Sequence, residues 1–238
     1  YSLKKRESVN LKPNTDWLNK QTYFNSITYN KTSKPNWNHN VLSNTTNNFD
    51  KVPWNKIPNF DNTIGDVKGI WEASRFDWVV IFSQAIRSGE QDYLETLNQW
   101  ISDWIKNNHP YLGINWKCGQ EASIRVLHLA IAELIIGDIK NTSQELLDLI
   151  EIHLSRIEPT ISYAISQDNN HGTSEAAALF IGGSWLLLNN RPEGIRWKKK
   201  GIKWLENRVA KLILPDGTFS QYSSNYQRLM LDTLSIVE

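Results

Sequence analysis

Two amides and an imidazole stand side by side in the middle of the chain. The stretch SQDNNHGTSEAAALF, residues 166–180, carries Asn169, Asn170 and His171 just before an apolar pattern of helical spacing. Amide and imidazole groups can donate hydrogen bonds to a carboxylate, and a helix N-terminus favours anions. The stretch is therefore suited to holding an acidic group, with Asn170 and His171 facing it and Asn169 shaping the turn.

Similar polar and aromatic residues stand at the starts of three other helical patterns. They are Trp71, Glu72 and Arg75; Asn115, Trp116, Gln120, Glu121 and Arg125; and Gln221, Tyr222, Asn225, Tyr226 and Arg228. If consecutive helices run antiparallel, all four starts lie at one end of the molecule. That end would be polar, aromatic and tolerant of anions, which fits an acidic sugar. The alternative is that the small polar residues merely cap their helices.

Seven helices are predicted from about residue 67 to the end. Their expected ranges are 71–88, 90–107, 118–136, 143–165, 173–189, 192–214 and 224–238. Ser143 should cap the fourth in a capping box, and Thr173 or Ser174 should cap the fifth. Short connections predict an all-α architecture of antiparallel helical hairpins, as a bundle, a solenoid or a toroid. The absence of a fixed repeat disfavours a simple solenoid.

The first part of the chain has a different character. Residues 1–65 are rich in Asn, Thr, Ser, Lys and Pro and keep no helical or strand period. We expect an irregular arm that packs on the helical domain through Trp17, Trp37 and Trp54. The expected division is residues 1–65 for the arm and 66–238 for a helical domain that is truncated at its C-terminal end.

Composition limits the class of protein. The formal net charge is +1, which argues against a dedicated nucleic-acid binder, and Lys198–Lys200 are predicted to lie on a solvated helix face. The single cysteine, Cys118, excludes an internal disulfide and a multi-cysteine zinc site. No apolar run approaches about 18 residues, so no membrane span is predicted.

Several chemistries could use the side chains of the polar end. His171 and Glu175 have i, i+4 spacing but no evident third ligand, so no metal site is predicted. No G-x-S-x-G nucleophile elbow is present. A glycoside hydrolase needs two carboxylates across a cleft, and the candidates are Glu72, Glu121, Glu175 and Asp216.

β-Elimination from a uronic acid suits amide, imidazole and phenol groups better. The sugar carboxylate must be neutralised, a base must remove the C5 proton, and an acid must protonate the leaving glycosidic oxygen. Asn170 can hydrogen-bond the developing enediolate, with His171 beside it. Tyr226 can act as base or acid if cations and helix ends lower its pKa from about 10.

Four stretches resemble, in order, the N-terminal α-helical domain of heparinase II/III-like polysaccharide lyases. They are DVKGIWEASRFDW, YLGINWKCGQEASIRVLHLA, DNNHGTSEAAALFIGG and LPDGTFSQYSSNYQRLMLD. The resemblance covers roughly residue 66 to the end of the chain. The resemblance implies an incomplete (α/α) toroid, followed by a β-sandwich domain that is absent from this chain. It also implies eliminative cleavage of uronate polysaccharides such as heparan-type glycosaminoglycans or alginate.

The resemblance implies roles for single residues. Asn170 resembles the carboxylate-neutralising amide, His171 its substrate-contacting partner, and Tyr226 the catalytic acid, in some members also the base. Arg75, Asn115, Trp116 and Gln120 match positions that line the family's cleft. We also expect substrate contacts from Glu175, Tyr222 and Arg228. Glu175 either orients His171 or faces a neighbouring helix. The chain departs from the family pattern at Gln221 and Gln227, where an acid and a histidine are common.

The remaining expectations concern partners and location. The resemblance implies that a second catalytic histidine and a structural zinc ion lie in the β-sandwich domain, so no cofactor is expected in this chain. The expected partners are an acidic polysaccharide and that domain, with neither nucleic acid nor membrane, and the chain alone should be weakly active or inactive. A periplasmic or secreted bacterial location is expected. A toroidal glycoside hydrolase and a non-catalytic polysaccharide-binding protein on the same fold are the alternatives.

Overall fold

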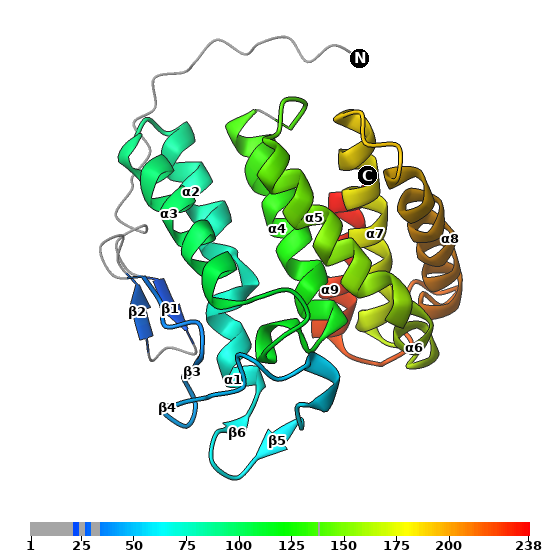
Figure 1. The fold of residues 1–238 in the computed structure, drawn as a ribbon. Helices are drawn as coiled ribbons and strands as arrows, with labels where there is room; N and C mark the ends of the chain where they lie inside the picture. The colour runs from blue at the N-terminus through cyan, green and yellow to red at the C-terminus, as the bar shows by residue number, and fades with distance from the viewer. Residues whose placement is uncertain (1–20, 24–26, 30–33, 138) are drawn as a thin grey trace.

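The computed structural model describes residues 21–23, 27–29, 34–137 and 139–238 and is built mainly of α-helices (Figure 1). Four helices form an inner layer in which each packs on the next: α2 (Asp77–Arg87), α4 (Gly119–Ile136), α7 (Asn170–Leu188) and α9 (Ser224–Val237). Three helices pack outside them: α3 (Asp92–Asn107), α5 (Gln144–Ile157) and α8 (Gly194–Leu212). Two layers of helical hairpins make an incomplete toroid, so the predicted all-α fold class is confirmed.

The four inner helices run in the same direction. Each begins at the lower end of the view in Figure 1, and each outer helix returns from the upper end. This polarity follows from short connections between consecutive antiparallel helices. The prediction that the polar helix starts share one end of the molecule is therefore confirmed for the backbone.

The first predicted helix, 71–88, is wrong at its start. Helix α1 (Lys68–Trp71) leads into the 3-10 helix η3 (Glu72–Arg75), and Phe76 then adopts a left-handed φ of 67° before α2 begins. A bulky residue rarely takes this conformation. Phe76 is fully buried, with its ring 4.9 Å from that of Trp104 in an edge-to-face contact, and this packing offsets the backbone strain.

The fourth predicted helix is two helices. Helix α5 ends at Ile157. The 3-10 helix η5 (Glu158–Thr160) follows, and then the short helix α6 (Ile161–Ser166). Pro159 has no backbone N–H to donate and interrupts the helical hydrogen bonds there. The predicted cap is confirmed, because Ser143 Oγ accepts a hydrogen bond from the N–H of Leu146.

The fifth predicted helix begins earlier than expected. Asn169 is the N-cap of α7, and its Oδ1 accepts a hydrogen bond of 2.9 Å from the N–H of His171. Thr173 and Ser174 are buried inside the helix, so the prediction that either is the cap is wrong. A preceding Asn can close the first turn as well as Ser or Thr does.

The arm contains short hairpins, which the sequence did not predict. The antiparallel pairs are β1 (Gln21–Tyr23) with β2 (Ile27–Tyr29), β3 (His39–Asn40) with β4 (Thr45–Thr46), and β5 (Phe60–Asp61) with β6 (Gly65–Asp66). Trp37 is buried in the main core, and Trp54 packs on that core beneath the guanidinium of Arg156, 3.5 Å from its ring centroid. Trp17, the third expected anchor, lies outside the described residues.

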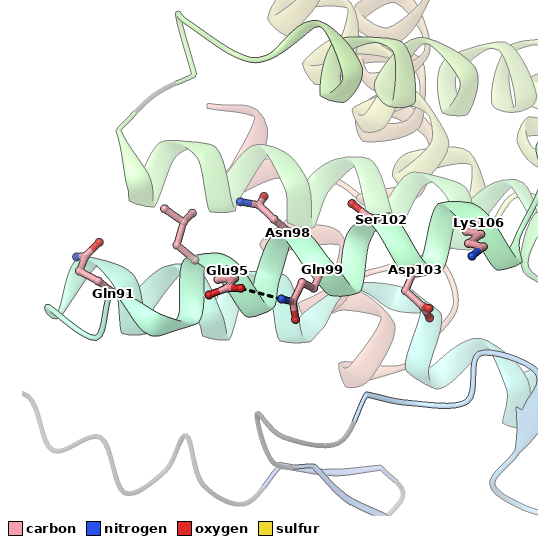
Figure 2. Close-up of a pocket in the computed structure, with 8 residues that line it drawn as sticks. Gln91, Glu95, Asn98, Gln99, Ser102, Asp103 and Lys106 are labelled. Atoms are coloured by element: carbon pink, nitrogen blue, oxygen red, sulfur yellow. Dashed lines mark hydrogen bonds between the residues drawn. The ribbon is translucent and has the colours of Figure 1, made fainter.

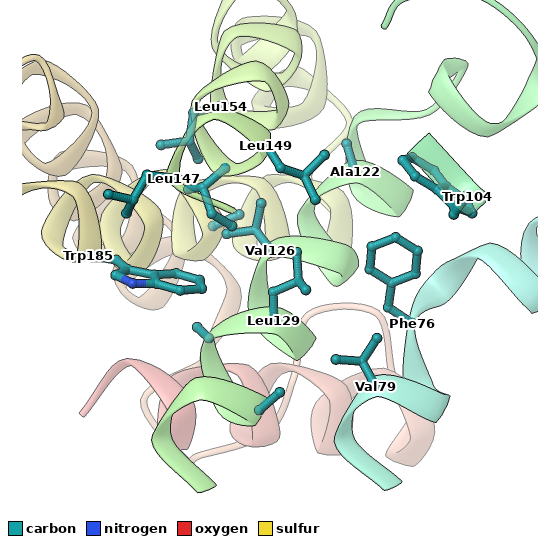
Figure 3. Close-up of a cluster of buried hydrophobic side chains, with 14 of the residues drawn as sticks. Phe76, Val79, Trp104, Ala122, Val126, Leu129, Leu147, Leu149, Leu154 and Trp185 are labelled. Carbon is teal, nitrogen blue, oxygen red and sulfur yellow. The ribbon is translucent and has the colours of Figure 1, made fainter. Parts of the chain in front are cut away.

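The core lies between the two helical layers. Figure 3 shows Val126 and Leu129 of α4 among side chains from the neighbouring helices, including Phe76, Leu147 and Trp185. Glycines let α7 and α8 approach closely, since a Cβ on Gly201 would lie 2.4 Å from the backbone N of Phe180. This packing sets the positions of the inner helix starts.

Candidate functional site at the starts of the inner helices

Two amides meet across the starts of α7 and α4. Nδ2 of Asn170 donates a hydrogen bond of 2.9 Å to Oε1 of Gln120. Asn170 is 7% exposed and Gln120 is half-buried. The bond uses the carbonyl side of the Gln120 amide, and no hydrogen bond among the described residues takes up its NH₂ group. The pair can therefore present N–H donors to an acidic group.

His171 follows directly in the first turn of α7. Its backbone is fixed by the Asn169 cap, which gives Asn169 the turn-shaping role expected of it. Burial lowers the pKa of the imidazole, an effect partly opposed by the charge of Glu121. His171 is thus a neutral, half-buried imidazole beside the amide pair.

Arg75 is held by two carboxylates. Its Nε and Nη2 donate to Oε2 and Oε1 of Glu121 at 2.8 and 3.0 Å, and its Nη1 donates to Oε2 of Glu72 at 2.8 Å. Burial lowers the pKa of Arg75, but the hydrogen bonds and charge of Glu121, with Glu72, leave it above its ordinary value. Arg75 therefore ties the start of α4 to η3, and its guanidinium is not a free cation for substrate.

Further titratable groups surround this ion pair. Burial raises the pKa of Glu72 against the opposing charge of Arg75. Burial also raises the pKa of Asp77 to about 6, although its Oδ1 accepts a hydrogen bond from the N–H of Trp78. The ring of His128 donates from Nδ1 to the backbone oxygen of Arg75, 2.7 Å away. Sequence reasoning missed Asp77 and His128, because neither stands in a recognisable motif.

Glu175 takes the second of its two expected positions. It is 3% exposed and packs on α4, where a Cβ on Gly119 would lie 2.6 Å from its Oε1. No hydrogen bond joins it to His171 among the described residues, and its Oε2 has no partner. Burial raises its pKa to about 8, against the charge of Arg156. The expectation that Glu175 contacts substrate is therefore not supported.

Asn115 and Trp116 belong to the core. Asn115 is fully buried and donates from Nδ2 to the backbone oxygen of Trp37 and to Oδ1 of Asn108, at 2.9 and 2.8 Å. Trp116 is 1% exposed and donates from Nε1 to the backbone oxygen of Asn108. With so little exposed surface, neither side chain can contact a polysaccharide, and the expectation that they line the site is corrected.

The start of α9 presents exposed side chains. Tyr222 is 89% exposed and Tyr226 is 43% exposed, and Arg228 is also exposed. Ser223 caps the helix by accepting from the N–H of Tyr226. α9 packs on α7, but no hydrogen bond among the described residues joins these three side chains to Asn170 or His171. The structure thus places them at the same end, open to solvent.

A buried arginine anchors the turn before α7. Arg208 of α8 is 2% exposed and donates from Nη1 to the backbone oxygen of Ile165 and to Oδ1 of Asp168, at 2.9 and 2.8 Å. Its Cδ lies 3.1 Å from where a Cβ of Gly172 would stand. Sequence reasoning missed Arg208, because its partners are some 40 residues away and no local pattern marks it.

The carboxylates do not form an opposed pair. Glu72 and Glu121 share Arg75, Glu175 is buried, and Asp216 accepts both its side-chain hydrogen bonds from Thr218 in a turn. This arrangement gives no support to the glycoside hydrolase alternative.

A shallow pocket lies away from this cluster, on α3 (Figure 2). It has a volume of about 820 Å³ and is lined by Gln91, Leu94, Glu95, Asn98, Gln99, Ser102, Asp103 and Lys106. Glu95 accepts a hydrogen bond from Gln99 in its wall. The pocket contains none of the predicted site residues. The candidate site is therefore identified by the types of side chain that it brings together and not by a hollow in the surface.

The described residues hold no group of three or more His, Cys, Asp or Glu side chains arranged to bind a metal ion. No helix within the same described part of the chain has the length and apolar character needed to cross a membrane.

Comparison with known proteins gives one match. The family model described as Heparinase II/III N-terminus matches residues 9–237, nearly the whole chain. No curated protein and no solved structure matches the chain.

Proposed function

The chain belongs to the heparinase II/III N-terminal family, and from this premise we propose that it forms the helical side of the active site of a polysaccharide lyase. The proposed reaction is β-elimination in a uronic-acid-containing polysaccharide. The observation that carries the proposal is the hydrogen bond between Asn170 and Gln120, which joins two amides at the shared end of the inner helices.

The amide pair serves to neutralise the sugar carboxylate. In our proposal, the second N–H of Asn170 and the NH₂ group of Gln120 donate to the carboxylate of the uronate. These bonds strengthen as the C5 proton leaves and negative charge builds on the enediolate. A preorganised donor of this kind is worth about 10²–10³ in rate.

The neutral imidazole of His171 is proposed to contact the same sugar. Because burial lowers its pKa, it can donate one hydrogen bond without bringing a positive charge that would bind the ground state equally well. Its position next to Asn170 in the first turn of α7 supports a contact with the same carboxylate or with a neighbouring hydroxyl.

Tyr226 is proposed to move the proton. Its hydroxyl, at the exposed start of α9, takes the C5 proton as a phenolate or gives a proton to the departing glycosidic oxygen as a phenol. When C5–H breaks, its electron pair forms the C4–C5 double bond and the C4–O bond breaks. The products are an unsaturated uronate end and a new hydroxyl end.

The remaining parts are proposed to come from outside this chain. A β-sandwich domain of the same protein would supply a second catalytic histidine and hold a structural zinc ion. The substrate would be met in the bacterial periplasm or outside the cell. The chain alone is then expected to be weakly active or inactive.

The test uses the full-length protein that contains this chain. It is incubated with heparan sulfate, hyaluronan and alginate, and the ultraviolet absorbance of unsaturated uronate ends is followed. We expect absorbance to rise with one of these polymers and Tyr226→Phe to abolish the rise. Tyr163→Phe is the matched control, since Tyr163 is an exposed tyrosine on α6, and it should leave the rate unchanged.

Two outcomes would point to the alternatives. Products with only saturated ends would indicate a glycoside hydrolase. Binding of a uronate polymer without any product, in the full-length protein, would indicate a non-catalytic binding protein. Either result would overturn the lyase proposal.

A further inference from the structure

Basic side chains follow one flank of α8 over most of its length. They are Arg196, Lys199, Lys200, Lys203 and Lys211. At 100° and 1.5 Å per residue they fall within an arc of about 120° and extend over about 22 Å. We call this surface the α8 ridge. It includes part of the Lys198–Lys200 run that the sequence predicted to be merely solvated.

The charge of the ridge is only partly balanced. Arg196 and Lys200 contact the carboxylate of Glu158, at 3.6 and 2.6 Å, and Lys211 contacts Asp168 at 2.6 Å. Across the described ranges, Lys199 and Lys203 have no ion-pair partner. Even with the exposed Glu206 beside Lys203 on the same helix, five cations against three carboxylates leave the ridge positive, in a chain whose net charge is only +1.

The ridge faces solvent. Helix α8 packs on α7 through its opposite face, where Trp197, Gly201 and Leu205 are buried. Figure 1 shows α8 as the outermost helix at one side of the molecule. Arg196 and Lys211 keep 59% and 55% of their side-chain surface exposed despite their acidic neighbours. The cations are therefore available to a large ligand.

The lower end of the ridge meets the candidate site. Lys211 and the buried Arg208 both bind Asp168, which directly precedes Asn169, the cap of α7. Asn170 follows at once. A chain-like ligand held at Asn170 and passing over Asp168 would reach Lys211 first and then the free cations farther up α8.

We propose that the α8 ridge is a second binding surface for the acidic polysaccharide, outside the reaction site, which retains the polymer between cleavage events. The identity of the polymer rests on the proposed function. A uronate polymer carries a negative charge at regular intervals, and flexible lysines bind such point charges without strict geometry. Short Lys-rich segments are typical of polyanion-binding patches.

The side chains of the ridge favour a polysaccharide over a nucleic acid. Single-stranded nucleic acids are bound with aromatic rings on which bases stack. Within α8 two rings lie against ridge cations. The Trp197 ring, 4.3 Å from Cζ of Arg196, is fully buried, and the Trp204 ring, 5.2 Å from Nζ of Lys203, is half-buried. The ridge therefore offers charge but no open stacking platform.

The experiment compares binding and turnover in the full-length protein. The variant Lys199→Glu/Lys203→Glu reverses the two cations that have no acidic partner. We expect affinity for a long uronate polymer, and KM on that polymer, to worsen about tenfold or more, since each lost surface charge contact is worth up to about 1 kcal/mol. kcat and KM on a tetrasaccharide should not change. Wild-type affinity should fall as salt rises.

The control keeps the same change of net charge. Lys56→Glu/Lys106→Glu reverses two exposed lysines on η2 (Trp54–Lys56) and α3, away from the ridge. An equal loss of polymer affinity in this control, or no loss in the ridge variant, overturns the proposal. The proposal is also overturned if the wild-type protein binds DNA as tightly as it binds the polymer and the ridge variant abolishes that DNA binding. The milder Lys199→Gln/Lys203→Gln should show an intermediate loss.

The two proposals can fail separately. Ridge-dependent polymer binding without any unsaturated product would overturn the lyase function and leave the ridge standing. Unsaturated product formed with the same polymer KM in wild type and ridge variant would overturn the ridge alone.

Discussion

Nδ2 of Asn170 lies 2.9 Å from Oε1 of Gln120, so that one hydrogen bond joins the first turns of α7 and α4. The two residues are 50 positions apart in the chain, and only the parallel packing of the inner helices brings them together. The bond fixes which side of each amide faces the other. It leaves the NH₂ group of Gln120 and the second N–H of Asn170 as donors for an acidic ligand.

This pairing predicts non-additive effects on turnover. Asn170→Ala and Gln120→Ala in the full-length protein should each lower kcat by about 10²–10³. The double variant should lose much less than the product of the two effects, because each amide orients the other. kcat at saturating polymer measures this, with Asn98→Ala on α3 as an exposed-amide control. Fully multiplicative losses would show that the two amides act independently.

The sequence predicted the arrangement of the helices better than the burial of single residues. Periodicity and short connections placed the polar helix starts at one end, because direction follows from succession alone. Burial depends on contacts between distant segments, so Asn115 and Trp116 looked like site residues although they bond to Asn108 and Trp37 in the core. For Glu175 the sequence left two positions open, and only the close approach to Gly119 decided between them.

Local breaks were also beyond the sequence pattern. Phe76 belongs to an uninterrupted apolar period, and its left-handed turn arises from packing against Trp104. The cap of α7 was assigned to Thr173 or Ser174 because both are good capping residues. Asn169 took the position instead, helped by Arg208 and Lys211 holding the preceding Asp168.

The buried carboxyl group of Glu175 should make the stability of the protein depend on pH. Its pKa is raised to about 8 in the folded state by burial, against about 4.3 when unfolded. Between these values the folded state keeps a proton that the unfolded state releases, so stability falls as pH rises, by up to about 1.4 kcal/mol per pH unit. Glu175→Gln, a neutral isostere, should remove this slope.

Urea midpoints of the full-length protein at pH 5, 7 and 9 measure the effect. The variant should match or exceed wild type at pH 7 and exceed it at pH 9. Glu206→Gln, at an exposed position on α8, should keep the wild-type slope. A Glu175→Gln variant with the same slope as wild type would show that the buried carboxyl does not titrate in this range.

The buried imidazole of His153 should make the protein less stable as pH falls, which is the opposite of the pH dependence expected from Glu175. Its Nε2 accepts from Nε of Arg125 at 2.9 Å and its Nδ1 donates to the backbone oxygen of Leu149 at 2.7 Å. Burial and the charge of Arg125 hold its pKa well below the ordinary value. Unfolded His titrates near about 6.5, so below that pH the unfolded state binds more protons and stability falls as pH falls, by up to about 1.4 kcal/mol per unit.

Unfolding midpoints between pH 7.5 and 5 check this sign. His153→Gln removes the titrating imidazole and should flatten this acid limb of the stability profile, at some cost in stability at pH 7.5. His109→Gln, at an exposed position, should leave the acid limb unchanged. If His153→Gln loses as much stability in acid as wild type does, other groups cause the acid limb.

A side chain at Gly201 should destabilise the close contact between α7 and α8. A Cβ there would lie 2.4 Å from the backbone N of Phe180 and 2.7 Å from the backbone oxygen of Ala176. Gly→Ala in a helix normally stabilises by about 0.4–1 kcal/mol, but here α8 must move away from α7. Overpacking of this kind costs about 1–3 kcal/mol, so Gly201→Ala should lower the urea midpoint while the exposed Glu206→Ala stays within about 0.5 kcal/mol. Arg208 lies on α8, as Gly201 does, and it holds the turn before Asn170. A shift of α8 should therefore also lower kcat on the polymer. A stabilised Gly201→Ala variant with unchanged kcat would contradict the close α7–α8 contact.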